Sequence, residues 1–195
     1  MKRIISEEEK NRKVKKNQLI VGGVLIFLMI FSTLGFAFSN RLDINNEKIK
    51  YKDIKFIKDS NTGYWNFKIN EIDFSTQYNP RETEDIYISN SLTINNYLNK
   101  PLYFVGENPE AVSEIARNLN SFVTRTNYAC LENEKCSGDF PVKDCSQDNI
   151  IIVKDVKENE ENKIYQQENC VFIAANYANQ LRYADRFLFG VLGVQ

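Results

Sequence analysis

Hydrophobic and polar residues divide the chain into two parts with different patterns. From Leu19 to Phe38 there is no charged residue. A helix over this run would be about 30 Å long, which matches the hydrocarbon core of a bilayer. Downstream, apolar residues recur at strand or helix spacing between charged ones, as in a folded domain. We therefore expect a transmembrane helix over 18–39 and a globular domain after it.

Basic residues lie directly before the apolar run. The first 17 residues carry seven positive and three negative charges, and basic side chains next to a span favour a cytoplasmic N-terminus. The pattern thus predicts a basic cytoplasmic tail over 1–17 and a single-pass span over 18–39 in the cell membrane. Residues 40–49 are polar and should form a juxtamembrane spacer, which leaves 50–195 as an extracytoplasmic domain.

A cleaved signal peptide is the alternative for the same run. Gly35 and Ala37, or Ala37 and Ser39, place small residues two apart, as a cleavage site needs. Against cleavage, the run exceeds the roughly 7–15 apolar residues of a signal core. We expect residues 18–39 to be retained as an anchor with the lipid bilayer as its partner.

The domain begins with an alternating pattern. Between Ile54 and Ile69, apolar and polar residues alternate on both sides of a turn that is rich in Asp, Ser, Asn and Gly. This predicts a β-hairpin with one buried face. Trp65, the only tryptophan, is expected in the core.

A polar loop and a short helix are expected next. Glu82, Glu84 and Asp85 form an acidic cluster, which we expect to be solvated; a site for a metal or a basic partner is the alternative. Residues 91–99 favour a short helix that ends before Pro101.

The clearest local signal is a buried strand followed by a helix. Residues 102–106 (LYFVG) form a continuous apolar run, as in a buried strand. Asn108 can cap a helix and Pro109 suits its first position. Apolar residues then recur at helical spacing, so we expect an amphipathic helix up to residue 126.

The turn between this strand and helix suggests a ligand hypothesis. Ligands favour the carboxyl ends of parallel strands, and helix N-termini bind anions. Glu107 and Glu110 would repel an anion, so we expect an ordinary turn here. A pocket at the strand ends near Gly106 is the alternative.

The C-terminal part repeats the combination of strands and a helix. Apolar runs predict strands at 149–153 and 170–175, with a further strand at 163–167, and a helix from about residue 178. A right-handed crossover should join the 102–106 strand, through its helix, to the 149–153 strand. The expected fold is α+β, a mixed sheet with two packed helices. The apolar end of the last helix should pack on the sheet; a docking patch is the alternative.

Composition narrows the chemistry. The chain has a net charge of −1, which leaves about −5 for the domain and disfavours nucleic acid as a partner. There is no histidine, which excludes Ser-His-Asp and Cys-His catalysis and His-ligated zinc. With no phosphate-binding loop either, we expect no enzyme activity, no catalytic or metal-binding residue, and no cofactor.

The four cysteines all lie in the domain, at Cys130, Cys136, Cys145 and Cys170. No Cys-x-x-Cys pair is present, and an even number of cysteines in an oxidising compartment favours two disulfides. Three connectivities are possible. A nested one, with Cys136–Cys145 inside Cys130–Cys170, is weakly preferred.

Several stretches carry a resemblance to a known group. The basic tail, the apolar run, "KPLYFVG", the cysteine loop, "IYQQENCVFIAA" and "ADRFLFGVLGV" together resemble small single-pass membrane proteins from archaeal genomes that have no assigned function. The resemblance covers most of the chain. It implies a membrane protein and an archaeal source, and it brings no catalytic residue.

Three functions are compatible with these observations. The first is a non-catalytic interaction or envelope-associated module that recruits an unknown protein partner. The second is a small-ligand-binding or sensory domain. The third, a carboxylate-dependent enzyme such as a glycoside hydrolase, has no recognisable motif to support it. The first is expected, and the second is the main alternative.

Overall fold

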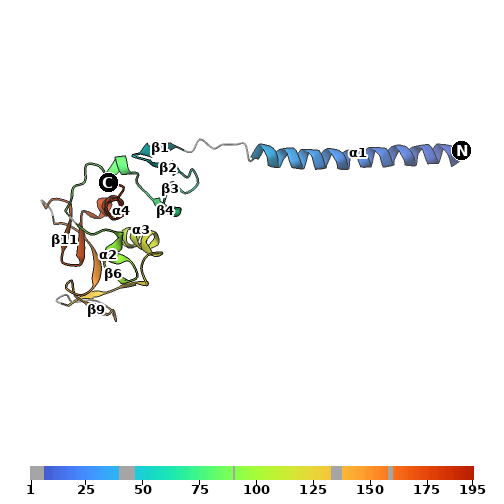
Figure 1. Cartoon of the computed structure of the whole chain (residues 1–195). Coiled ribbons are helices and arrows are strands. Elements are labelled where there is room, and N and C mark those ends of the chain that lie inside the picture. The colour runs from blue at the N-terminus through green and yellow to red at the C-terminus, as the bar shows by residue number, and fades with distance from the viewer. Residues whose placement is uncertain (1–6, 40–46, 90, 133–137, 158–159) are drawn as a thin grey trace. The chain divides into compact units, whose positions relative to one another are not determined.

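The computed structural model (Figure 1) describes residues 7–39, 47–89, 91–132, 138–157 and 160–195. The chain divides into an N-terminal unit, Met1–Asn45, and a folded unit, Asn46–Gln195. Parts of the expected tail and spacer lie outside the described residues. Lys48 and Ile49, which the sequence analysis assigns to the spacer, are the first residues of strand β1.

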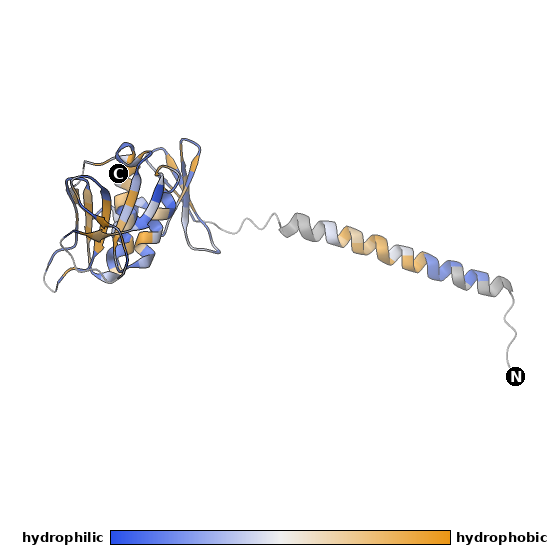
Figure 2. Ribbon diagram, turned by 90° about the horizontal axis from the view of Figure 1, so that it is seen from below, coloured by the Kyte–Doolittle hydropathy of each residue, from blue (hydrophilic) through white to orange (hydrophobic). Residues whose placement is uncertain are grey.

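The N-terminal unit contains one long helix, α1 (Glu7–Ser39). Residues 15–33 of this helix are long and apolar enough to cross a membrane. Large side chains stand exposed along them, with Leu19 at 78% and Met29 at 72%. Figure 2 shows these apolar residues in orange after a blue, polar stretch. A helix of this kind is typical of a membrane span or of a signal sequence.

A six-stranded mixed sheet forms the centre of the folded unit, with the strand order β5–β11–β12–β10–β6–β7. The strands are β5 (Ile88–Ser89), β6 (Pro101–Gly106), β7 (Arg125–Tyr128), β10 (Asn149–Lys154), β11 (Lys163–Gln167) and β12 (Cys170–Ala174). β12, β10, β6 and β7 are mutually parallel, whereas β11 runs antiparallel to β12 and parallel to β5. The predicted mixed sheet is confirmed.

Two helices cover one face of this sheet, which we call the helix face. They are α3 (Pro109–Leu119) and α4 (Gln180–Val191). Alternate strand residues meet the apolar stripes of both helices in one core. This core includes Leu102, Phe104, Ile151, Val153, Val171 and Ile173 of the strands and Val112, Ile115, Leu119, Ala184, Phe187 and Leu188 of the helices. The short helix α2 (Ile94–Tyr97) adds Tyr97, whose ring lies 6.4 Å from that of Phe187.

The opposite face of the sheet, which we call the disulfide face, carries a smaller core. Its buried strand residues are Tyr103, Ile150, Ile152 and Cys170. Ala129, Leu131 and Cys145 pack against them from outside the sheet. Two strands of two residues each, β8 (Cys130–Leu131) and β9 (Val142–Lys143), pair in parallel in this region.

A separate four-stranded antiparallel sheet precedes the mixed sheet in sequence. It consists of β1 (Lys48–Tyr51), β2 (Ile54–Lys58), β3 (Trp65–Ile69) and β4 (Ile72–Thr76). The predicted hairpin corresponds to β2 and β3, and Trp65 is buried at 1% exposure as expected. The two outer strands are not predicted from the sequence.

The end of α4 closes the core of this second sheet. Phe189 lies 6.1 Å from Phe56 and 5.9 Å from Phe67 between ring centroids, and Val194 is fully buried in the same cluster. The expectation that the apolar end of the last helix packs against a sheet is therefore confirmed. The docking-patch alternative is wrong, because these side chains are covered by the chain itself.

The sequence prediction for the helix after β6 is too long. α3 ends at Leu119, and Arg125–Tyr128 forms strand β7 beside β6. The apolar residues Phe122 and Val123 continue the helical spacing, but they sit in a turn instead. The carbonyl of Phe122 accepts a hydrogen bond from Asn99, and Thr124 donates one to Lys100. As a result β6 leads through α3 to β7. The predicted crossover from β6 to the 149–153 strand is therefore wrong. That strand, β10, pairs with the edge of β6 that faces away from β7.

Candidate functional site

The carboxyl ends of the adjacent strands β6 and β10 lie side by side, and the chain leaves them towards opposite edges of the sheet. β6 leads through α3 to β7 at one side of the sheet, whereas β10 leads through β11 to β12 at the other. Ligands in open sheets bind in the crevice outside such a switch point. A cavity of about 400 Å³ lies here and is lined by the last residues of both strands. We call it the strand-end pocket.

Gly106 shapes the β6 side of this pocket. It pairs with Val153 of β10 and has a φ of 151°, a backbone conformation that favours glycine. A Cβ atom at this position would lie only 2.3 Å from the carbonyl oxygen of Val153. Glycine therefore lets the two strand ends stay paired while the chain turns towards α3.

Asn108 fixes the start of α3 beside the pocket, as the sequence predicts. Its Oδ1 accepts hydrogen bonds from the backbone N–H groups of Glu110 (3.1 Å) and Ala111 (3.2 Å). Its own carbonyl accepts the N–H of Val112 at 3.2 Å. Since Pro109 has no N–H, the first free donors of the helix are already used within the chain.

The pocket has an apolar floor and aromatic walls. Val105, Ile152 and Phe172 come from adjacent strands of the disulfide face and form the floor. Tyr128 at the end of β7 and Phe140 form one wall, with their ring centroids 6.2 Å apart.

Tyr177 contributes from the turn after β12, in the short 3-10 helix η2 (Tyr177–Asn179). The exposed fractions of the three wall residues are 40% for Tyr128, 45% for Phe140 and 58% for Tyr177. Exposed aromatic side chains that gather around one concave site are typical of a binding surface.

Charged residues lie at the rim. Glu107 and Asp155 follow the ends of β6 and β10 directly, and both line the pocket. Lys154 lines it as well, with its Nζ 5.0 Å above the ring of Phe172 and 5.7 Å from that of Tyr165. These two rings stack in parallel at 4.8 Å. The pocket therefore combines two carboxylates, one ammonium group and several π faces.

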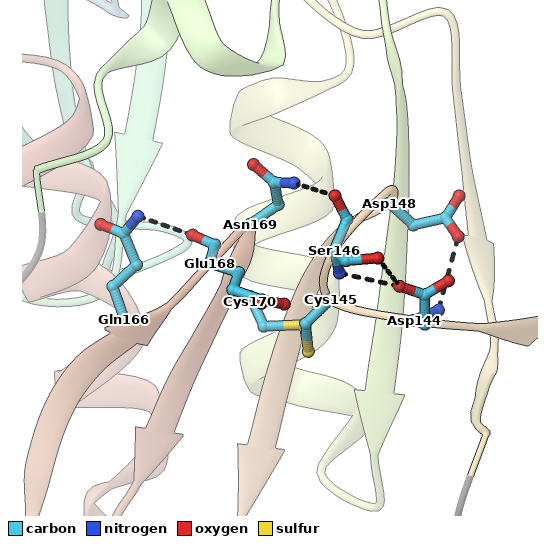
Figure 3. The surroundings of a disulfide bond; sticks show 8 residues. All are labelled: Asp144, Cys145, Ser146, Asp148, Gln166, Glu168, Asn169 and Cys170. Carbon is cyan, nitrogen blue, oxygen red and sulfur yellow. Dashed lines mark hydrogen bonds between the residues drawn. A yellow bond between two sulfur atoms is a disulfide. The ribbon is translucent and has the colours of Figure 1, made fainter.

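A disulfide holds the wall segment to the sheet. Cys145 is bonded to Cys170, the first residue of β12 (Figure 3). The backbone N–H of Asn169 donates to the carbonyl of Cys145 at 3.0 Å, and its side-chain amide donates to that of Ser146 at 3.0 Å. The segment of residues 138–148, which carries Phe140, is thus attached to the strand end by both covalent and hydrogen bonds. We call it the disulfide segment.

Polar contacts order the disulfide segment itself. Asp144 accepts hydrogen bonds from the backbone N–H and the hydroxyl of Ser146, and these bonds lower the pKa of its carboxyl. Lys143 forms an ion pair with Asp148 at 3.0 Å, which raises the pKa of the lysine. Its Nζ also lies 4.5 Å above the ring of Tyr103.

The weakly preferred cysteine pairing is wrong. Cys145 bonds to Cys170, whereas the nested scheme pairs it with Cys136. The physical reason is the position of β12 beside β10, which brings Cys170 next to the residues that lead into β10 and not next to β8. Cys130 is also disulfide-bonded, and Cys136 lies outside the described residues. A disulfide in this domain is therefore confirmed.

A second cleft lies on the other side of α3, beside a buried carboxyl pair. The cleft has a volume of about 520 Å³, and Glu114 is among the residues that line it. Glu114 accepts hydrogen bonds from the N–H of Gln77 (3.1 Å) and from Arg117 (2.7 Å). Asp185 of α4 is fully buried and accepts the N–H of Tyr78 at 2.8 Å.

The charge of Glu114 acts on the buried carboxyl group of Asp185 beside it. Oδ1 of Asp185 is buried and meets no hydrogen-bond donor among the described residues. A proton on this oxygen, donated to Glu114, would satisfy it. Burial, and then the charge of Glu114, raise the pKa of Asp185 well above its usual range. The pair joins α3, α4 and the segment after β4.

The acidic loop serves local structure. Glu82 accepts the backbone N–H of Asn79 at 2.7 Å and closes a capping box on the short 3-10 helix η1 (Pro80–Thr83). Asp85 forms an ion pair with Arg182 of α4, and Glu84 is exposed. Within the described parts of the chain, no three His, Cys, Asp or Glu side chains form a group that could hold a metal ion.

In the sequence analysis, a pocket at the strand ends near Gly106 is only the alternative prediction. The aromatic residues that form its walls are not predicted. Tyr128 falls after a segment that the sequence assigns to a helix, Phe140 lies in an irregular segment, and Tyr177 lies in the short 3-10 helix η2. The available signal was the presence of aromatic residues within otherwise polar loops. Asp185 gave a similar signal, since it is a single acidic residue on an apolar helix face.

No protein family model matches the chain, and neither a curated protein nor a solved structure shows significant similarity to it.

Proposed function

We propose that the folded unit is a non-catalytic, membrane-anchored domain on the outer side of the cell membrane that binds a small organic ligand in the strand-end pocket. The observation that carries this proposal is the gathering of Tyr128, Phe140 and Tyr177 around a concave site at a strand switch point. Pockets of a few hundred Å³ with an apolar lining and a few polar groups are typical of small-ligand sites.

Two features support the location. The Cys145–Cys170 disulfide favours an oxidising compartment outside the cytosol. The apolar part of α1 follows a stretch rich in lysine and arginine, which favours a cytoplasmic N-terminus and an external folded unit. Protease added to intact cells should therefore digest the folded unit, and its protection would contradict this orientation.

Binding without catalysis fits the residues of the pocket. Its described lining contains no serine, threonine, cysteine or histidine that could act as a nucleophile or as the base of a triad. A small ligand is favoured over the protein partner that the sequence analysis expects first, because the exposed aromatic residues surround a hollow. A protein-docking surface more often presents such residues on a broad patch.

The test uses the full chain in an uncharged polyoxyethylene detergent, which carries neither a sugar nor an ionic group. Saturation-transfer NMR would be recorded with a panel of small sugars, amino acids, carboxylic acids and amines. We expect signals from a subset of one chemical class, and their loss in the Tyr177→Ala variant. The matched control is Tyr87→Ala, which removes a tyrosine that is 80% exposed and lies outside the pocket. Absence of any signal, or equal loss in both variants, would refute the proposal.

A further inference from the structure

The chemistry of the strand-end pocket narrows the class of its ligand. This inference rests on the proposed function, since it takes the pocket to be a binding site. Three independent features bear on the charge of the ligand: the rim carboxylates, the aromatic rings and the start of α3.

The rim charges favour a positive ligand. Glu107 and Asp155 stand at the ends of the two strands that meet at the switch point, and Lys154 is the only basic residue in the described lining of the pocket. Both carboxylates belong to exposed residues. These carboxylates are therefore solvated and remain available to a ligand. Oδ1 of Asp155 accepts a hydrogen bond only from the adjacent N–H of Val156 (3.1 Å) among the described contacts.

The aromatic rings favour a cation as well. A cation within about 6 Å of a ring centroid is attracted by the negative π face, and groups of such rings bind quaternary ammonium ligands. The chain itself uses this attraction at the edge of the pocket, where the Lys154 ammonium lies 5.0 Å from the centre of the Phe172 ring. The rings of Tyr128, Phe140 and Tyr177 are partly exposed, and no cation–π contact to them is found in the described parts of the chain.

The start of α3 does not offer the usual site for an anion. A helix N-terminus binds anions through its unpaired N–H groups. Here Asn108 takes the N–H groups of Glu110 and Ala111 with its side chain and that of Val112 with its carbonyl. The negative side chain of Glu107 lines the pocket at the same turn, so this end of the pocket repels an anion.

We propose that the strand-end pocket binds an organic cation, with its ammonium group between the aromatic walls and the Glu107 and Asp155 carboxylates. The hydrocarbon part of the ligand lies on the floor formed by Val105, Ile152 and Phe172. Lys154 opposes the ligand and sets a limit on its affinity.

Choline and its uncharged carbon isostere, 3,3-dimethylbutan-1-ol, test this directly because they have the same shape and differ in charge. The full chain in the same polyoxyethylene detergent would be titrated with each compound by NMR. We expect choline to bind about tenfold more tightly than the isostere, as desolvated cation–π contacts allow. Raising the salt concentration should weaken choline binding and leave the isostere unaffected.

Two charge variants and a control sharpen the result. Glu107→Gln should weaken choline binding about threefold, and Lys154→Met should strengthen it by a similar factor, since one removes an attraction and the other a repulsion. Glu110→Gln is the matched control: it makes the same charge change three residues along, at a residue that lines the second cleft instead. All three positions are exposed, so folding should be preserved.

The outcomes separate this inference from the function on which it rests. Equal binding of choline and the isostere would overturn the cation proposal and leave a ligand pocket standing. Binding of a neutral or anionic panel compound that depends on Tyr177, without binding of choline, would overturn it in the same way. If no compound of the panel binds at all, the proposed function itself fails.

Discussion

The two faces of the six-stranded sheet use the same strands but are covered in different ways. On the helix face, α3 and α4 bury a continuous apolar core that includes eighteen buried residues. On the disulfide face, the described part of the chain contributes five buried residues to the core, and they are covered by a pair of two-residue strands that the Cys145–Cys170 bond fastens. Stability should therefore come mainly from the helix face. The strand-end pocket lies on the disulfide face.

This difference has a physical logic. A core closed by two helices excludes water along its whole length and leaves no room for a ligand. A face covered by an irregular segment leaves side chains half-exposed at its margin, where they are available for binding. Sites of this kind are commonly built from loops on a rigid scaffold. The helix face would then act as the scaffold, and the disulfide segment as a wall of the binding site.

The largest expected effect is loss of an aromatic side chain from the helix face. Phe187 is fully buried and packs at a right angle to Tyr97. Phe187→Ala should reduce the free energy of unfolding by about 3–5 kcal/mol, because it removes contacts and leaves a cavity. Phe140→Ala, on the disulfide face, removes the same ring from a residue that is 45% exposed and should cost less than about 1 kcal/mol.

Denaturant unfolding of both variants, followed by the fluorescence of the buried Trp65, would measure the difference. Equal losses in the two variants would contradict the assignment of stability to the helix face.

Removal of the Cys145–Cys170 bond should come second. The bond closes a loop with a sequence separation of 25, and a loop of that length is expected to contribute about 3 kcal/mol. The double variant Cys145→Ala, Cys170→Ala isolates this bond from the one that involves Cys130. We expect a lower unfolding midpoint and early proteolytic cleavage within residues 138–148. Ligand binding should also weaken, because Phe140 loses its attachment.

Cleavage that begins in α3 or α4 instead would show that the bond supports the helix face and not the disulfide segment.

The sequence predicted the helix face better than the disulfide face, and the reason is physical. Strand β6 and the start of α3 follow from a local apolar run, an Asn cap and a Pro, which are all short-range signals. The end of α3 was missed because Phe122 and Val123 keep the helical spacing while the chain turns to pair with Asn99 and Lys100. That pairing is a tertiary contact, which local periodicity does not contain.

The disulfide face depends almost entirely on long-range contacts. The Cys145–Cys170 pairing follows from the position of β12 beside β10, and this neighbourhood cannot be read from cysteine spacing. The aromatic walls of the strand-end pocket come from three segments between Tyr128 and Tyr177 that are separated in sequence. Only its location, at the Gly106 turn, follows from a local pattern and the rule for strand ends.

A smaller effect is expected from the buried carboxyl pair of Glu114 and Asp185, which joins α3, α4 and the segment after β4. Burial raises the pKa of Asp185 well above its ordinary value of 3.8. Below about pH 4 this carboxyl is protonated in both the folded and the unfolded chain. As the pH rises from there through the folded pKa, the unfolded chain releases the proton and the folded chain retains it, so this contribution to stability is progressively lost.

Two amide variants test this arrangement in opposite directions. Asp185→Asn keeps a donor towards Glu114 and an acceptor for Tyr78, so it should flatten this pH dependence and be at least as stable at neutral pH. Glu114→Gln replaces one of the two acceptor oxygens that receive the donors of Gln77, Arg117 and Asp185. It should lower the free energy of unfolding by about 1–3 kcal/mol. Unfolding midpoints between pH 4 and 9 would show the contrast. Equal destabilisation by both variants would contradict a protonated Asp185.

The smallest effect is expected at Asn108, where the helix face and the strand-end pocket meet. Its side chain accepts the N–H groups of Glu110 and Ala111, and loss of such a cap costs about 1 kcal/mol. Asn108→Ala should lower stability by this amount, whereas Asn108→Ser keeps an oxygen acceptor and should recover most of it. The alanine variant also frees two N–H groups beside the rim, so choline should bind more weakly because the helix start now presents partial positive charge. The alanine variant could instead lose stability without any change in choline affinity. The cap would then stabilise α3 alone, and the cation would lie too far from the start of this helix to interact with its charge.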